Sequence, residues 1–181
     1  MNRRARWVVA VVAVQAALVG LYWLVERQRA PAPAQTLDTR PPQRVSMLMP
    51  TLTVRRRDGT AVALAPFARP TLVHVWATWC PPCRAELPGL LALPSEHAVE
   101  VVAIALDDRW GDVDRFLDDL DASSVVLGDS REVERALGVS SLPVTLLVQA
   151  DGRVSLRFDG ARDWTDEAFV KAHVAAAVDV R

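Results

Sequence analysis

The chain's two cysteines, Cys80 and Cys83, stand three positions apart in a sequence of 181 residues. They follow an apolar, β-branched run at 71–77, typical of a buried strand, and they open a stretch predicted to be helical. Three positions are nearly one helical turn, so both sulfur atoms lie on one side and can be bridged. A helix N-terminus stabilises a thiolate and lowers a cysteine pKa from about 8.5 to between about 3.5 and 7.5. The pattern predicts a redox-active pair in which Cys80 attacks and Cys83 resolves the mixed disulfide.

Three other uses of a cysteine pair fit the sequence less well. A metal site needs further ligands, but His74, His97 and His173 are scattered without ligand spacing. Covalent haem attachment requires a histidine directly after the second cysteine, where this chain has Arg84. A disulfide that closes so short a loop restricts the unfolded chain little, so a purely structural bridge would contribute weakly to stability. We therefore expect no resident metal or cofactor.

The elements that must position the cysteines alternate between strand and helix patterns. Further strands are predicted at 51–55, 61–64, 99–106, 125–127, 144–148 and 153–158, and helices at 80–91, 112–121, 131–137 and 165–178. Asp58-Gly59 and Asp151-Gly152 are hairpin turn signals between pairs of these strands. This order predicts an α/β domain over residues 47–181, with a sheet covered on both faces.

The N-terminal part predicts a membrane anchor. Residues 7–25 are apolar apart from Gln15, and as a helix they would span about 28 Å, close to the thickness of a bilayer's hydrocarbon core. The arginines within residues 1–6 place that end in the cytoplasm and the rest of the chain outside it. Residues 26–46, rich in proline, are predicted to be an extended linker. A cleaved signal peptide and a buried soluble helix are the two alternatives.

The formal net charge of −1 conceals an uneven distribution. Residues 1–57 contain ten arginines and two acidic residues, whereas residues 58–181 contain 11 basic and 20 acidic residues. The net charge of −1 is close to neutral, which argues against nucleic-acid binding. The two cysteines are too few for a disulfide-rich miniprotein. The arginines match the predicted membrane topology, and the acidic excess belongs to the predicted domain outside the cytoplasm.

Two motifs carry a resemblance to a known family. The segment WATWCPPCRAELP at 76–88 resembles the active-site segment of the membrane-anchored TlpA/ResA/CcmG-type thioredoxin-like proteins. The segment GVSSLPVT at 138–145 resembles the loop of that family that carries a cis-proline. The resemblance covers about residues 47–178. It implies a thioredoxin-like fold, a central mixed sheet flanked by helices, with an N-terminal β-hairpin and a central insertion at about 107–127, preceded by one transmembrane helix.

The resemblance also implies roles for residues near the cysteines. Pro143 would adopt the cis form beside the disulfide and leave neighbouring backbone groups free to pair with a client, although an ordinary turn proline is the alternative. Trp79, Pro81 and Leu142, together with Pro143, are the expected client contacts. Pro88 matches the proline that kinks the active-site helix of the family.

Two ionisable residues have open roles. Glu86 lies one turn beyond Cys83 and is either a proton donor and acceptor for that thiol or a solvated surface acid. His74 stands where plain thioredoxins have a buried acid and many relatives have asparagine, which puts a carboxylate relay at that position in doubt. It is either a hydrogen-bonded core residue or a proton relay.

Together these features predict a membrane-anchored thiol-disulfide oxidoreductase that reduces partner-protein disulfides outside the cytoplasm. The resemblance implies a role such as that in cytochrome c maturation. Apocytochrome c, a copper-centre protein and a general thiol pool are all compatible clients, and an upstream membrane thiol reductase would restore the dithiol. A thiol oxidase or isomerase with the same cysteines is one alternative. A copper-handling chaperone that holds Cu(I) between the two thiolates is another.

Overall fold

The computed structural model describes residues 7, 12–20, 37–118, 120–121 and 123–176. The chain divides into two units, Met1–Gln35 and Thr36–Arg181. In the first unit residues 12–20 are helical. Within the described ranges, no helix has both the length and the apolar character needed to cross a membrane. Residues 8–11 and 21–25 of the predicted span lie outside those ranges, so the transmembrane helix stays a prediction.

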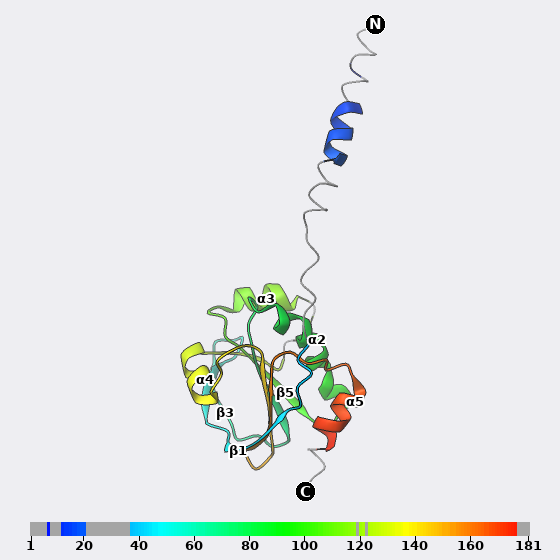
Figure 1. Ribbon diagram of the computed structural model, residues 1–181. Coiled ribbons are helices and arrows are strands. Elements are labelled where there is room, and N and C mark those ends of the chain that lie inside the picture. Colours follow the sequence, from blue (N-terminus) through cyan, green and yellow to red (C-terminus); the bar gives the residue numbers. More distant parts are fainter. Residues whose placement is uncertain (1–6, 8–11, 21–36, 119, 122, 177–181) are drawn as a thin grey trace. The chain divides into compact units, whose positions relative to one another are not determined.

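The second unit is organised around a mixed sheet (Figure 1). Its strands are β1 (Gln43–Leu48), β2 (Leu52–Arg55), β3 (Ala61–Leu64), β4 (Thr71–Trp76), β5 (Glu100–Ala105), β6 (Val125–Gly128), β7 (Val144–Val148) and β8 (Arg153–Asp159). In the described residues they form one eight-stranded sheet in the order β1-β8-β7-β4-β5-β6-β2-β3. Strand β4 pairs with β5 in parallel and with β7 in antiparallel orientation, which confirms the predicted mixed sheet.

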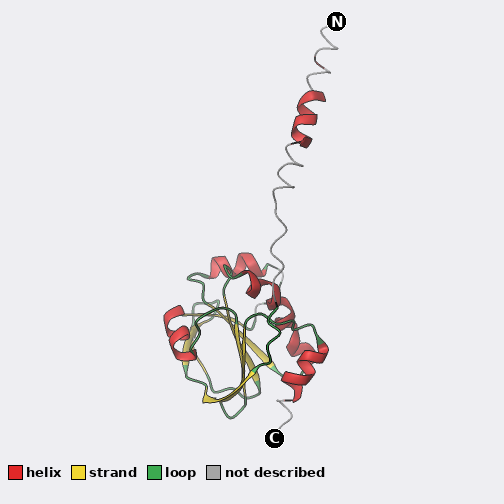
Figure 2. Cartoon of the chain, viewed as in Figure 1, coloured by secondary structure: helices red, strands yellow, loops and turns green. Residues whose placement is uncertain are grey.

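Helices cover both faces of this sheet (Figure 2). They are α2 (Pro81–Glu96), α3 (Trp110–Leu117), α4 (Ser130–Leu137) and α5 (Glu167–Val170), which continues as the π-helical turn η1 (Lys171–Ala175). Helix α4 packs so closely on β5 and β6 that a Cβ atom at Gly128 would lie 2.6 Å from Ile104 and 2.8 Å from Val133. Helix α2 covers the other face of the sheet. The side chain of His74 on β4 points toward this face, where it lies beside Glu86 of α2.

Local sequence explains the elements nearest the cysteines. All six residues of β4 are buried, as its unbroken apolar run predicts for a strand covered on both faces. The β2–β3 hairpin turns at Gly59, whose φ of +84° favours glycine, and this confirms the predicted N-terminal hairpin. Asp129 caps α4 by accepting a hydrogen bond from the Glu132 N–H, and Gly138 ends that helix with a left-handed conformation.

Several predicted boundaries differ from the structure. Helix α2 continues past residue 91 to Glu96, with Pro88 and Pro94 inside it, because Leu87, Leu90 and Leu93 are buried in the core and offset the lost hydrogen bonds. Helix α3 begins at Trp110 and ends at Leu117, before the predicted end at residue 121. The predicted helix at 165–178 begins instead at Glu167, after the N-cap Asp166.

The folded unit also begins before residue 47. Strand β1 starts at Gln43 inside the predicted linker, because its backbone pairs with β8 and completes that edge of the sheet. Still earlier, the Asp38 N–H donates to the Ala161 carbonyl at 2.8 Å. The prediction of an extended linker as far as residue 46 is therefore wrong for its last part, and residues 26–36 lie outside the described residues.

Candidate active site

A disulfide joins Cys80 and Cys83 at the N-terminus of α2. The S–S distance is 2.04 Å and the two Cα atoms are 5.3 Å apart. Cys80 is the N-cap residue, and its Sγ accepts a hydrogen bond from the Cys83 N–H at 3.3 Å. Cys80 retains 6% of its surface exposed while Cys83 is fully buried, so a partner's sulfur reaches Cys80 first. This arrangement supplies the helix-terminus environment that the spacing predicted.

The proline motif lies at the same end of the sheet as the disulfide. The Leu142–Pro143 peptide bond is cis, as the resemblance implied. Strand β7 begins directly after Pro143, and its first residue, Val144, pairs with Val75 near the end of β4. Because β4 and β7 are antiparallel neighbours, the chain leaving β4 toward Cys80 and the chain entering β7 meet at one edge.

The four residues predicted to contact a client lie near this edge of the sheet, and they differ in how far their side chains are exposed. Trp79 is 66% exposed, an unusual state for so large an apolar side chain. Pro81 is exposed, Leu142 is half-buried and Pro143 is buried. A hollow of about 330 Å³ lies beside Trp79 and extends to α3, where the Arg84 guanidinium lies over the Phe116 ring at 5.0 Å. The hollow next to the loop that carries Cys80 is thus lined by two aromatic rings and by charged side chains, namely Trp79, Phe116, Arg84, Asp107, Asp112 and Arg115.

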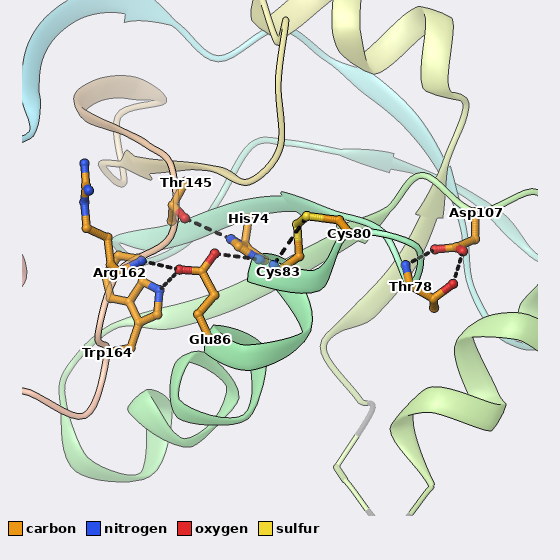
Figure 3. Close-up of a disulfide and its surroundings, with 9 residues drawn as sticks. All are labelled: His74, Thr78, Cys80, Cys83, Glu86, Asp107, Thr145, Arg162 and Trp164. Carbon is orange, nitrogen blue, oxygen red and sulfur yellow. Dashed lines mark hydrogen bonds and ion pairs between the residues drawn. A yellow bond between two sulfur atoms is a disulfide. The ribbon is translucent and has the colours of Figure 1, made fainter. Parts of the chain in front are cut away.

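Glu86 and His74 are held together beneath the disulfide (Figure 3). Glu86 Oε2 accepts hydrogen bonds from the Arg162 backbone N–H at 2.6 Å and from Trp164 Nε1 at 3.0 Å. Glu86 Oε1 lies 3.6 Å from His74 Nε2, and His74 Nδ1 lies 2.9 Å from Thr145 Oγ1. The interpretation of Glu86 as a solvated surface acid is wrong, because the side chain is 1% exposed. The prediction of His74 as a hydrogen-bonded core residue is confirmed.

Burial keeps this pair of side chains neutral. It raises the pKa of Glu86 from 4.5 to about 8, although N–H groups of Arg162 and Trp164 and the Arg162 charge oppose the shift. It lowers the pKa of His74 from 6.5 to about 3. The distance between them fits an ion pair, but both pKa directions favour a protonated carboxyl and a neutral imidazole at pH 7. The Glu86 carboxyl, one helical turn from Cys83, therefore holds a proton at neutral pH.

The sequence did not indicate several residues of this site. Arg162 and Trp164 reach Glu86 from 76 and 78 positions away, and no local pattern marks them. Asp107 accepts hydrogen bonds from the Thr78 N–H at 3.0 Å and from the Thr78 hydroxyl, and so ties the loop before Cys80 to the end of β5. Its place directly after an apolar strand was the available signal. In the described residues, no three potential ligand side chains converge as a metal site.

Comparisons with known proteins agree with this geometry. The family model described as Redoxin matches residues 44–174. The chain is 34% identical over 94 residues to the thiol-disulfide oxidoreductase ResA of Oceanobacillus iheyensis, covering 50% of this chain and 49% of the relative. It is 37% identical over 86 residues to the thiol:disulfide interchange protein CycY of Rhizobium leguminosarum, covering 46% of each. The matched region thus spans about half the length of these curated relatives.

Solved structures extend the likeness over more of the chain. A thiol:disulfide interchange protein, DsbE, from Chlorobium tepidum superposes with a TM-score of 0.65 at 26% identity, covering 79% of this chain and 99% of that one. The thioredoxin domain of an oxidoreductase from Bacteroides vulgatus, at 24% identity and a TM-score of 0.57, has the same fold and covers 68% of this chain and 96% of its own. The chain belongs to the Redoxin family and, within it, to the TlpA/ResA/CcmG-type thioredoxin-like proteins.

Proposed function

We propose that this protein is a thiol-disulfide oxidoreductase that reduces disulfides in client proteins. The observation that carries the proposal is the Cys80–Cys83 disulfide at the start of α2, with the accessible sulfur beside exposed Trp79 and the buried sulfur one turn from Glu86. A structural disulfide would require neither the accessible sulfur nor a buried acid one turn away.

The reaction begins from the dithiol. The Cys80 thiolate attacks one sulfur of the client disulfide, a Cys80–client S–S bond forms, and the other client sulfur leaves as a thiolate that is protonated by solvent. Cys83 then loses its proton and attacks Cys80 Sγ, which forms the observed disulfide and releases the first client sulfur as a thiolate. Two electrons pass to the client. An upstream dithiol protein reduces Cys80–Cys83 by the same steps in reverse.

Glu86 handles the proton of the buried sulfur. When the upstream thiolate attacks Cys80, Cys83 leaves as a thiolate in a site from which water is excluded. The protonated Glu86 carboxyl supplies the proton, so that a Cys83 thiol and a Glu86 carboxylate result. During client reduction the proton returns to Glu86 as Cys83 becomes the attacking thiolate. A pKa of about 8 suits this exchange because it lies close to that of a thiol.

A trapping experiment tests the proposal. In the full-length chain, Cys83→Ser leaves Cys80 able to attack but unable to resolve, so a peptide with one internal disulfide becomes covalently attached and is released by reductant. The matched control, Cys80→Ser, forms no adduct because Cys83 is buried. Absence of an adduct with Cys83→Ser would refute client reduction.

The reduction potential separates the proposal from its alternatives. A reductase is expected to have a potential near that of thioredoxin, about −270 mV, whereas an oxidase lies near about −120 mV. Tight Cu(I) binding by the reduced full-length chain, together with no reaction with the disulfide peptide, would favour the copper chaperone instead.

The proposal for the protein's location in the cell rests on its sequence. We infer that residues 7–25 anchor the protein in the cell membrane, that residues 1–6 are cytoplasmic, and that the catalytic domain faces the periplasm or an equivalent outer space. The resemblance supports a client in cytochrome c maturation, such as apocytochrome c, and a copper-centre protein or a general thiol pool is the alternative. Full-length protein is expected to stay with membranes washed in alkaline carbonate. Its release into the wash, or the loss of the N-terminal segment from the mature chain, would contradict the anchor.

A further inference from the structure

The two carboxyl oxygens of Glu86 are in different states. Oε2 accepts two hydrogen bonds, from the Arg162 backbone N–H and from Trp164 Nε1. Oε1 has no hydrogen-bond partner in the described part of the chain, and it faces His74 Nε2, which has none either. An oxygen that already accepts two N–H groups has little capacity left for a proton of its own. This leaves Oε1, which faces His74 Nε2 at 3.6 Å, as the oxygen with free capacity for the proton of the neutral acid.

The opposite nitrogen of the imidazole is set by the sheet. His74 on β4 and Thr145 on β7 are directly paired across the two strands, and both side chains are buried. The Thr145 hydroxyl is therefore held against Nδ1 at 2.9 Å. The Thr145 hydroxyl can donate to Nδ1 or accept from it, and a neutral imidazole has one N–H group. In the tautomer whose Nδ1 donates to Thr145, Nε2 is left as the acceptor for Glu86.

We propose that Thr145 and His74 act as a tautomer lock that holds the exchangeable proton of the redox site on Glu86 Oε1. Both are positioning residues that act through Glu86, and the use of that proton by Cys83 rests on the proposed function. With Nε2 as acceptor, the lock stabilises the protonated carboxyl and disfavours the carboxylate, because an unshared electron pair would then face a negative oxygen. The lock thus keeps the Glu86 carboxyl protonated, and therefore neutral, while the cysteines are oxidised.

Each element packed around Glu86 contributes a group that affects the protonation of its carboxyl. Helix α2 contributes Cys83, β4 contributes His74 and β7 contributes the uncharged Thr145. The segment after β8 contributes Arg162, whose charge opposes protonation of Glu86, and Trp164, whose N–H favours the carboxylate. The lock and the burial of Glu86 raise the pKa of its carboxyl, whereas the segment after β8 lowers it.

The first test reads the tautomer directly. In the oxidised full-length chain in detergent micelles, the ¹⁵N chemical shifts of the His74 ring are expected to show Nδ1 protonated and Nε2 unprotonated at pH 7. Protonation of Nε2 in the unmodified chain would overturn the proposal. This measurement requires no variant and no turnover.

The second test changes the lock and follows Glu86. Thr145→Val replaces the hydroxyl with a methyl group of similar shape, so the imidazole is free to carry its proton on Nε2 and to donate it to a Glu86 carboxylate. The ¹³C titration of the Glu86 carboxyl is expected to move down from a midpoint near 8, with proton affinity about tenfold lower, the effect of one hydrogen bond. Thr145→Ser keeps the hydroxyl and is expected to keep the midpoint.

A purely structural role predicts other results. If Thr145→Val lowered the melting temperature but left the Glu86 midpoint unchanged, the lock would be refuted. If that variant does not fold, the ¹⁵N measurement on the unmodified chain still decides the proposal. These titrations are independent of catalysis. A failed client-trapping experiment with an intact titration pattern would refute the proposed function alone.

Discussion

At the scale of single residues, burial rather than pairing governs the chemistry of this site. Glu86 and His74 are close enough to form an ion pair, yet each is almost completely removed from water. Desolvation of two charges in such a place costs more than their attraction returns unless further hydrogen bonds compensate. The neutral pair avoids that cost and stores a proton beside the buried sulfur. A carboxyl group can therefore act as an acid near neutral pH within the core of the domain.

This neutral pair predicts how stability depends on pH. Between pH 4.5 and about 8 the folded state retains the Glu86 proton that the unfolded chain loses, so its contribution to stability falls as pH rises. Between pH 6.5 and about 3 the unfolded chain gains a His74 proton that the folded state refuses, so that contribution falls as pH decreases. The two slopes cancel between pH 4.5 and 6.5. We expect a plateau there and losses on both sides, measured by urea unfolding of the full-length chain.

Glu86→Gln isolates one side of this profile. The amide oxygen can accept the N–H groups of Arg162 and Trp164 while the NH₂ group donates to His74, which imitates the protonated acid without its titration. The alkaline loss between pH 6.5 and about 8, on the order of 2 kcal/mol, is expected to disappear, and the acid loss is expected to remain and to begin already at pH 6.5. An alkaline loss of unchanged size in this variant would show that another group causes it.

At the scale of elements, the active-site loop is fixed from both ends. Helix α2 holds the cysteines on one side, and the hydrogen bonds from Thr78 to Asp107 attach the preceding turn to the end of β5. This turn carries Trp79, whose side chain faces solvent. The clamp therefore joins the two parallel strands β4 and β5 just where the chain leaves the sheet for the disulfide.

Removal of the clamp is expected to affect both stability and rate. Asp107→Ala leaves the Thr78 N–H without its acceptor, and we expect a loss of about 1–3 kcal/mol in unfolding free energy. Reduction of a disulfide peptide should also slow, because Cys80 and Trp79 are no longer held in one geometry. Asp108→Ala is the matched control, since Asp108 is the exposed neighbour. A rate equal to that of the control would limit the clamp to a structural role.

The elements also show which parts of the fold were predictable from sequence. Strand β4, both glycine hairpins and the start of α2 were predicted because local patterns specify them, and the family resemblance supplied the cis-proline. Strand β1 was missed because all its residues are exposed or half-buried, so its pairing with β8 leaves no hydropathy signal. The exposure of Glu86 was undecided because its two N–H donors come from a segment far along the chain, and only tertiary packing brings them together.

At the scale of the folded unit Thr36–Arg181, its first residues are connected to the redox site through one arginine. Arg162 is 3% exposed, and its guanidinium donates to the backbone carbonyls of Asp38 and Asp159 and pairs with the Asp38 carboxylate at 3.3 Å. The backbone N–H of the same residue holds Glu86. Displacement of the segment at Asp38 would therefore alter the position and charge of a group that contacts the buried acid.

Arg162→Met tests this connection. The variant keeps the backbone N–H but removes the charge that opposes Glu86 protonation, so the Glu86 midpoint is expected to rise further above its ordinary value. Loss of the guanidinium contacts is expected to cost about 3 kcal/mol in unfolding free energy, by analogy with other broken buried pairs. Arg153→Met, at an exposed position on β8, is the control. An unchanged Glu86 midpoint in Arg162→Met would mean that the N-terminal segment is not coupled to the site.

The position of β4 in the sheet has a consequence for hydrogen exchange. This strand is fully buried and is paired along its length on both sides, so its amide hydrogens should exchange with deuterium only when the whole domain unfolds. The edge strands β1 and β3 should exchange through smaller openings. His74 therefore lies in the part of the domain that solvent reaches last, and exchange of its amide hydrogen is expected to report unfolding of the whole domain.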